Sequence, residues 1–189
     1  NRHGIVTRGS VAAERIVGGF ARVYPVLKMM EESGRCRRGY FVDGLGGAQF
    51  ALPGAVDRMR ALVDVPDREM QTQVVAATDP ANPYGAALPW PDRDGGHRAG
   101  RKAGSLVVLV GGTLVLYVEK GGRTLLSYSD DETLLAPAID ALALAAREGM
   151  LGRLTVQKAD GESIEDTPFA EALLNAGFRL TSRGLRLRA

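Results

Sequence analysis

Residues 77–104 gather a carboxylate, an indole and a basic cluster in one proline-rich stretch. Asp79 is the one carboxylate of segment 77–85, and a carboxylate held in a site can activate water or stabilise a cationic transition state. Asp79 also precedes Pro80, and an aspartate before a proline is a common turn former. The sequence therefore offers Asp79 both as a candidate catalytic residue and as a structural residue of a turn.

Two further features of this stretch suit contacts with a polyanion. Trp90, which lies between two prolines, can stack on a base or can close one end of an apolar domain. Arg98, Arg101 and Lys102 alternate with glycines, which is typical of a flexible loop that binds phosphate. We therefore predict contacts with DNA at Trp90 and at these three cations.

Other kinds of site are missing from the sequence. It contains no Gly-x-x-x-x-Gly-Lys-Ser/Thr loop for nucleotide phosphates and no Gly-x-Ser-x-Gly turn for a serine nucleophile. His3, Cys36 and His97 are too far apart in sequence to predict a zinc site, so we expect no metal and no cofactor in this chain. The single cysteine excludes an internal disulfide and suits a reducing cytoplasm. The sequence has no run of 18 apolar residues that would predict a membrane span, and no secretion signal opens the chain.

Residues 1–62 predict a winged-helix domain. A short helix near 7–15 is followed by two glycines and a second helix over about 20–33, whose residues Phe20, Val23, Leu27 and Met30 share one face. Residues 35–53 then read as strand, glycine-rich turn and strand. Two helices with a short turn, followed directly by a hairpin, are the pattern of a winged helix.

The positive charge of the chain is concentrated in the same part. Residues 1–60 carry 10 Lys and Arg against 5 Asp and Glu, a net charge of +5, whereas the whole chain of 189 residues has +2. In a winged helix the second helix enters the major groove and the wing meets the backbone. The expected DNA contacts are Arg8, Arg22, Lys28, Arg35, Arg37 and Arg38. Winged helices also serve as protein-binding modules, and an arginine run can be only a solvated edge, so that alternative stays open.

The rest of the chain predicts an α+β domain. Residues 63–105 form the proline-rich connector with a first strand near 73–76, and residues 106–189 form the β-rich domain. Three apolar runs over 106–110, 114–118 and 124–128 predict a meander that curls into a small β-barrel with packed helices. A capping-box pattern at Ser129–Glu132 predicts a helix of about fifteen residues. The alternation of apolar and basic residues over 185–188 predicts an edge strand.

Several long motifs together resemble the C-terminal region of Lhr, the large helicase-related protein family of bacteria. The most extended is Arg-Arg-Gly-Tyr-Phe-Val-Asp-Gly-Leu-Gly-Gly-Ala-Gln-Phe-Ala-Leu-Pro-Gly-Ala over 37–55. Others are Ala-Ala-Thr-Asp-Pro-Ala-Asn-Pro-Tyr-Gly over 76–85 and Gly-Arg-Lys-Ala-Gly over 100–104, with shorter matches at 6–9 and 18–20. The resemblance spans nearly the whole chain.

This resemblance implies that the chain is the tail of a much larger ATP-dependent DNA helicase associated with repair. The motor, with its ATP and Mg²⁺, would lie upstream. The family's C-terminal region is described as tandem winged helices plus a β-barrel and is similar to DNA glycosylases of the AlkZ type, some members being credited with uracil-DNA glycosylase activity. The AlkZ-type signature is Gln-x-Gln or Gln-x-Asp, and Gln71-Thr72-Gln73 has that spelling without an alignment to place it.

Three functions are therefore expected, in order of preference. The first is a DNA-binding region that grips single-stranded or duplex DNA and positions it for the upstream motor of a cytoplasmic repair helicase. The second is a glycosylase, which needs a pocket for a flipped base with a carboxylate or amide at its floor. The third is a module for homo-oligomerisation. The sequence leaves open whether this chain is itself an enzyme.

Overall fold

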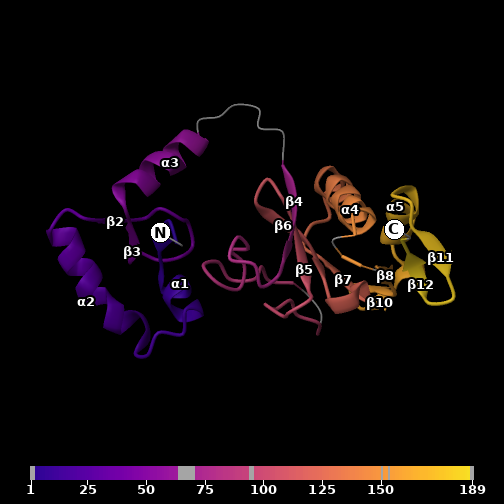
Figure 1. Cartoon of the computed structure of the whole chain (residues 1–189), viewed down its shortest axis with the longest axis horizontal. Coiled ribbons are helices and arrows are strands. Elements are labelled where there is room, and N and C mark those ends of the chain that lie inside the picture. The colour runs from indigo at the N-terminus through magenta and orange to yellow at the C-terminus, as the bar shows by residue number, and fades with distance from the viewer. Residues whose placement is uncertain (1–2, 64–70, 94–95, 150, 153, 188–189) are drawn as a thin grey trace. The chain divides into compact units, whose positions relative to one another are not determined.

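A computed structural model of the chain describes residues 3–63, 71–93, 96–149, 151–152 and 154–187 (Figure 1). The chain divides into two compact units. The first contains Asn1–Arg68 and Pro83–Pro89, and the second contains Glu69–Asn82 and Trp90–Ala189. The proline-rich stretch therefore contributes residues to both units.

The first unit has the order of elements of a winged helix. They are β1 (Ile5–Val6), α1 (Arg8–Ala13), α2 (Gly19–Glu32), β2 (Arg37–Gly39), β3 (Gln49–Ala51) and α3 (Pro53–Val63). The three strands form an antiparallel sheet in the order β1-β3-β2, with Phe50 opposite Val6 on one side and opposite Arg38 on the other. Residues 40–48 connect β2 to β3 and form the wing. The winged helix predicted from the sequence is confirmed.

Local features fix the start of α1 and the end of α2. Thr7 and Ser10 form a reciprocal capping box at the start of α1, with Ser10 N donating to Thr7 Oγ1 over 3.1 Å and Thr7 N donating to Ser10 Oγ over 2.8 Å. Helix α2 ends at Glu32, and Gly34 follows the cap residue Ser33 with a φ of 70°, in the left-handed region that favours glycine. Pro25 lies inside α2 on its exposed side, and the helix continues through it from Gly19.

The core of the first unit is small and lies between α2 and the sheet. Leu27, Cys36 and Phe50 are buried there, and Phe20, Val23, Tyr24 and Met30 pack around them. The segment Pro83–Pro89 also comes close to α1. A β-carbon at Gly9 would lie 3.0 Å from the carbonyl oxygens of Ala86 and Ala87, so only glycine allows this approach.

In its described residues the second unit contains two sheets, two α-helices and two short 3-10 helices. The larger sheet has the order β10-β9-β7-β6-β5-β4, and its strands are β4 (Thr72–Ala76), β5 (Leu106–Val110), β6 (Thr113–Val118), β7 (Thr124–Ser127), β9 (Lys158–Ala159) and β10 (Glu162–Ser163). The smaller has the order β11-β12-β8, with β8 (Thr155–Val156), β11 (Arg179–Thr181) and β12 (Gly184–Arg186). The helices are η1 (Lys120–Gly122), α4 (Glu132–Arg147), η2 (Ile164–Asp166) and α5 (Phe169–Asn175).

Helix α4 covers the apolar side of the β4–β6 meander (Figure 1). Its residues Ala138, Leu142 and Ala146 join Val108, Leu116 and other strand residues in the main core. The sequence pattern of 106–128 is therefore explained by a strongly apolar sheet that needs a helix to cover it.

The predicted barrel is not formed. Among the described residues β4 pairs only with β5, and β10 pairs only with β9, so the two ends of the sheet do not meet. The physical reason is that α4 supplies the apolar cover that closure would otherwise provide. The fold class is α+β, with a winged helix followed by an open, helix-covered sheet.

Two smaller expectations are also corrected. Helix α4 begins after Asp131, whose carboxylate accepts from Thr133 N over 2.8 Å, so the cap is Asp131 rather than Ser129. Strand β12 pairs with both β11 and β8 and is therefore a central strand, not an edge. An alternation of apolar and basic residues indicates the two faces of a sheet, and it does not distinguish an edge strand from a central one.

No helix in the part of the chain that the structure describes is long and apolar enough to cross a membrane.

Candidate nucleic-acid interface

Helix α2 of the first unit carries apolar residues on its buried side and also among the exposed residues of its other side. Leu27 faces the core, whereas Val26 and Met29 are 50% and 60% exposed. Arg22 and Lys28 are exposed on the same helix. In a winged helix this is the helix that enters the major groove, where apolar side chains meet thymine methyl groups and cations meet phosphates.

Three of the six cations predicted to bind DNA in this unit already have partners. The Arg8 guanidinium lies over the Phe20 ring, 5.4 Å from its centre. Lys28 pairs with Glu32 one turn later, over 3.8 Å. Arg38 donates to the Tyr24 hydroxyl over 3.0 Å and pairs with Glu31 over 3.4 Å. These contacts offset part of each charge and hold the side chains in place.

The other three cations are Arg22, Arg35 and Arg37. All three are exposed, and no described residue gives any of them an ion pair or a side-chain hydrogen bond. Arg35 follows the Gly34 turn, with its N–H donating to Met30 O over 2.8 Å, and Arg37 begins β2. Two unpaired guanidiniums therefore lie on a backbone that the end of α2 and the sheet hold in place.

The wing is held by one buried side chain. Gln49 is fully buried, and its Oε1 accepts from the N–H groups of Phe41 (3.1 Å) and Val42 (2.8 Å). Its Nε2 donates to the carbonyls of Val42 (2.7 Å) and Gly46 (2.8 Å). The amide thus uses both its donors and its acceptor on wing backbone, which gives a glycine-rich loop with little regular pairing a defined conformation.

In the second unit, Asp79 lies at a tight turn. Its Oδ1 accepts from Ala81 N over 2.8 Å, and its backbone carbonyl accepts from Asn82 N over 3.0 Å. Arg101 fixes the same turn by donating to the carbonyls of Thr78 (3.1 Å), Asp79 (3.0 Å) and Asn82 (2.8 Å). In this geometry the Asp79 carboxylate stabilises a turn, and the Arg101 guanidinium donates hydrogen bonds to three backbone carbonyls of that turn.

The remaining predicted contacts of this unit lie near the end of β6. Lys102 pairs with Glu119 over 3.3 Å, and His97 contacts the same carboxylate oxygen over 2.8 Å. Burial favours the neutral acid, but the hydrogen bonds from His97 and Lys102 outweigh it, so the pKa of Glu119 lies below its ordinary value. Arg98 is exposed and has no ion-pair partner in the described part of the chain.

Trp90 belongs to the same neighbourhood. Its ring meets Tyr117 edge to face with 5.7 Å between centres, and the buried Tyr117 donates its hydroxyl to Gly100 O over 3.1 Å. These contacts attach the chain on both sides of segment 91–99 to strand β6. The half-buried indole therefore already takes part in packing against Tyr117.

An ion pair that sequence reasoning missed joins distant parts of this unit. Arg93 is 13% exposed, and its guanidinium pairs with Asp160 over 2.5 Å. Asp160 also accepts from the N–H of Ser127 (2.8 Å) and from its hydroxyl (2.7 Å). The dipeptide Asp160-Gly161 is a turn signal, but no sequence pattern indicates which cation, 67 residues away, would pair with Asp160.

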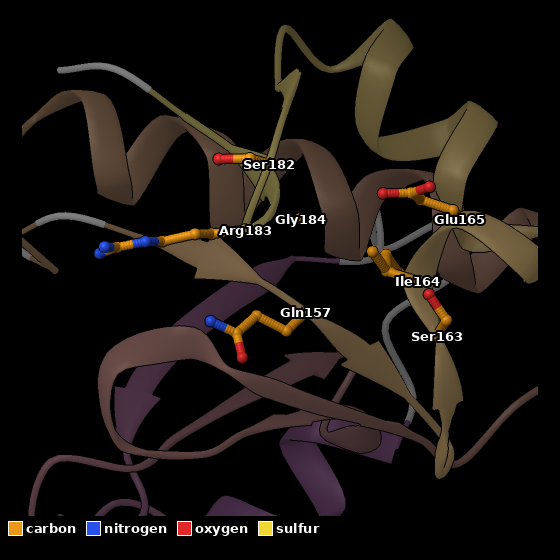
Figure 2. Close-up of a pocket in the computed structure, with 7 residues that line it drawn as sticks. All are labelled: Gln157, Ser163, Ile164, Glu165, Ser182, Arg183 and Gly184. Carbon is orange, nitrogen blue, oxygen red and sulfur yellow. The ribbon is translucent and has the colours of Figure 1, made fainter.

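The second unit also has an open polar pocket of ≈ 390 Å³. It is lined by Gln157, Ser163, Ile164, Glu165, Ser182, Arg183 and Gly184. Figure 2 shows these residues arriving from the β8–β9 link, from β10 and η2, and from the β11–β12 turn. The Arg183 guanidinium extends away from Glu165, so the two charges do not neutralise each other across the hollow (Figure 2). Asp79 does not line this pocket.

Two remaining candidate chemistries are a metal site and the thiol of Cys36. Within the described ranges, His, Cys, Asp and Glu do not gather in groups of three or more that could hold a metal ion. Cys36 is buried and lies 3.5 Å from Leu27 O, and burial raises the pKa of its thiol. A buried thiol of raised pKa behaves as an apolar core residue rather than as a nucleophile.

The fold and the exposed arginines define the first unit as a winged-helix domain. Residues 1–71 match the family model described as the winged-helix domain of the large helicase-related protein, Lhr. The whole chain is also similar to two curated proteins. It is 49% identical over 197 residues to "Lhr helicase/ probable uracil glycosylase" of Mycolicibacterium smegmatis, covering 99% of this chain and 13% of that protein.

The second relative is "Lhr helicase/uracil glycosylase" of Escherichia coli, 40% identical over 188 residues, which cover 98% of this chain and 12% of that protein. The chain therefore belongs to the Lhr family, as its motifs predicted. It spans about one eighth of the length of these two relatives.

Proposed function

We propose that this chain is a DNA-binding region of an ATP-dependent DNA repair helicase, which grips DNA and positions it for a motor elsewhere in the longer protein. One observation carries the proposal. Arg22, Arg35 and Arg37 are exposed and unpaired among the described residues of a winged helix, on α2 and at the start of the wing hairpin. Unpaired cations bind phosphate without first giving up a protein partner.

The proposed binding mode uses both parts of the winged helix. Helix α2 enters the major groove with Val26 and Met29 toward the bases, and Arg22 reaches the backbone. Arg35 and Arg37 contact phosphates beside the groove, from the start of the hairpin. ATP and Mg²⁺ would act in the motor of the longer protein, because this sequence has no phosphate-binding loop. Such a protein would work in the cytoplasm, with single-stranded or duplex DNA as its partner.

The test is the salt dependence of DNA binding by the 189-residue chain. Removing one phosphate contact should lower the slope of log K against log salt by about 0.9. The double variant Arg35→Ala/Arg37→Ala should therefore lower the slope by about 2 and weaken duplex binding. Arg58→Ala removes an exposed arginine from α3 and is the matched control. Binding that does not change with salt, or equal effects of the double variant and the control, would contradict the proposal.

A second function is favoured by the names of the relatives together with the pocket of the second unit. Both relatives carry uracil glycosylase in their names. The pocket offers an amide, Gln157, and a carboxylate, Glu165, which are the groups that a flipped base and a cationic transition state require. We propose this pocket as the site of base excision if the chain has that activity.

The experiment is a base-release assay on uracil-containing DNA. Glu165→Gln should abolish release if this pocket is the site, whereas Asp79→Asn should abolish it if the proline-rich turn is the site. Gln71→Ala and Gln73→Ala test the Gln-x-Gln spelling in the same assay. No release by the unmodified chain would remove glycosylase activity from this region while leaving the DNA-binding proposal intact.

A further inference from the structure

The wing presents one large aromatic side chain to solvent. Tyr40 is 84% exposed, far more than the other aromatic residue of the wing, Phe41, which is half-buried. No described residue makes a ring contact or a hydrogen bond with the Tyr40 side chain. The alternation of side chains along a strand predicts that one of these two neighbours is a core residue. Neither is fully buried, and Tyr40 is the one that faces solvent.

The position of this ring is defined although it is exposed. A β-carbon at Gly47 would lie 2.6 Å from the Tyr40 hydroxyl oxygen and 3.0 Å from Cζ, so the ring rests against the bare backbone of Gly47. The next residue, Phe41, rests in the same way on Gly39, 3.2 Å from where a β-carbon would be. The N–H groups of Phe41 and Val42 are bound by the buried Gln49. The backbone that carries Tyr40 is therefore fixed on both sides.

The charges around Tyr40 select the ligand class. Arg35 and Arg37 are exposed and lack described partners. They precede Tyr40 by five and three residues, Arg35 at the bend before β2 and Arg37 at the start of β2. An aromatic ring next to cations suits a nucleobase attached to its phosphates, because each base has a face that can stack.

We propose that Tyr40 is a stacking platform for the first unpaired base beside a duplex, so that the wing recognises the junction of double- and single-stranded DNA. The inference rests on the proposed DNA-binding function and adds to it a preference for a DNA structure. The arginines bind the duplex backbone, and the ring receives the base that leaves the stack. A fully paired duplex has no such base and gains nothing from Tyr40.

The test is a double-mutant cycle with one change in the protein and one in the DNA. Binding affinities are measured with the 189-residue chain at one salt concentration. Fork DNA is compared with the same fork lacking the base at the first unpaired position, for the unmodified chain and for Tyr40→Ala. Either change alone should weaken fork binding by about 5- to 150-fold, the range that corresponds to one stacked base. The two changes together should weaken it no further. Tyr40→Phe should keep the stacking, and Tyr40→Leu should lose it.

Two controls separate this inference from the function on which it rests. Val17→Ala shortens a different exposed apolar side chain of the same unit, 91% exposed, and it should leave fork binding unchanged. Duplex binding should depend on Arg35 and Arg37 but not on Tyr40. If that holds while the two changes add independently on the fork, the stacking inference is wrong and DNA binding stands. If the unmodified chain binds neither DNA, both are wrong.

Discussion

Gln49 shows how one polar residue can determine the conformation of a functional loop. It is fully buried and makes four hydrogen bonds to wing backbone. Gln49→Ala leaves these backbone groups without their partner, and we expect a loss of about 2–4 kcal/mol in the free energy of unfolding of the first unit. Amide hydrogen exchange should become faster at Phe41 and Val42 in particular.

The matched control is Gln73→Ala, which changes an exposed glutamine of strand β4. A surface substitution of this kind should stay within about 0.5 kcal/mol of the unmodified chain. If Gln49→Ala and Gln73→Ala gave the same exchange rates at Phe41 and Val42, the wing would be held by something other than the buried amide.

Glu119 gives the second unit a contribution to stability that depends on pH. Its pKa is lower in the folded chain than its ordinary value of 4.5, because hydrogen bonds from His97 and Lys102 exceed the opposing effect of burial. The stabilisation is therefore fully present above that ordinary value and is lost as the pH falls through the lowered pKa. The melting-temperature difference between the unmodified chain and Glu119→Gln should shrink over this acid range.

A control variant makes this a selective test. Glu162→Gln removes an exposed glutamate of the same unit, for which no ion pair occurs among the described residues, and it serves as the control for charge alone. A difference that stayed constant from about pH 7 down to about pH 3 would contradict the role given to Glu119.

At the scale of elements, helix α4 is the cover of the large sheet and replaces barrel closure. Leu142 is fully buried against the strands, whereas Leu144, two residues later on the same helix, is 54% exposed. Leu142→Ala should lower the free energy of unfolding by about 2–5 kcal/mol, because it removes apolar packing and leaves a cavity. Leu144→Ala should change it by less than about 0.5 kcal/mol. Urea unfolding followed by far-UV circular dichroism measures both.

The elements themselves were largely predictable from local pattern. The apolar spacing of Phe20, Val23 and Leu27 indicated α2. Gly34, a residue type common just after a helix, follows it with a positive φ. The glycines of the wing indicated a hairpin. Barrel closure was not predictable, because closure depends on whether the last strands meet the first or a helix covers the open face. Three strands of similar apolar character are compatible with both arrangements.

The candidate site was predictable by residue type and not by partner. Six cations of the first unit have the same status in the sequence, yet Arg8, Lys28 and Arg38 contact Phe20, Glu32 and Glu31. Of these contacts only the pair between Lys28 and Glu32 has a helical spacing that the sequence displays. Tyr40 was visible as one of two neighbouring aromatics, but its exposure depends on Gln49 and Gly47, whose roles appear only in three dimensions.

At the scale of the whole molecule, the two units carry basic clusters with different contacts. In the first unit Arg22, Arg35 and Arg37 lack described partners. In the second unit Arg101 is committed to three carbonyls and Lys102 to Glu119. Because a paired cation must exchange one partner for another, it adds less to phosphate binding than an unpaired one. The first unit should therefore carry most of the salt dependence of DNA binding.

This difference can be measured on the 189-residue chain with two multiple variants. Arg22→Ala/Arg35→Ala/Arg37→Ala should lower the slope of log K against log salt by about 2.7, which is about 0.9 for each phosphate that is no longer bound. Arg98→Ala/Lys102→Ala should lower it by about 1 at most, since only Arg98 lacks an ion pair with a described residue. Arg101 is left unchanged because its loss would release the turn at Asp79. An equal fall in slope for both variants would mean that the second unit also grips the DNA backbone, and that the proline-rich stretch binds DNA as well as supporting the fold.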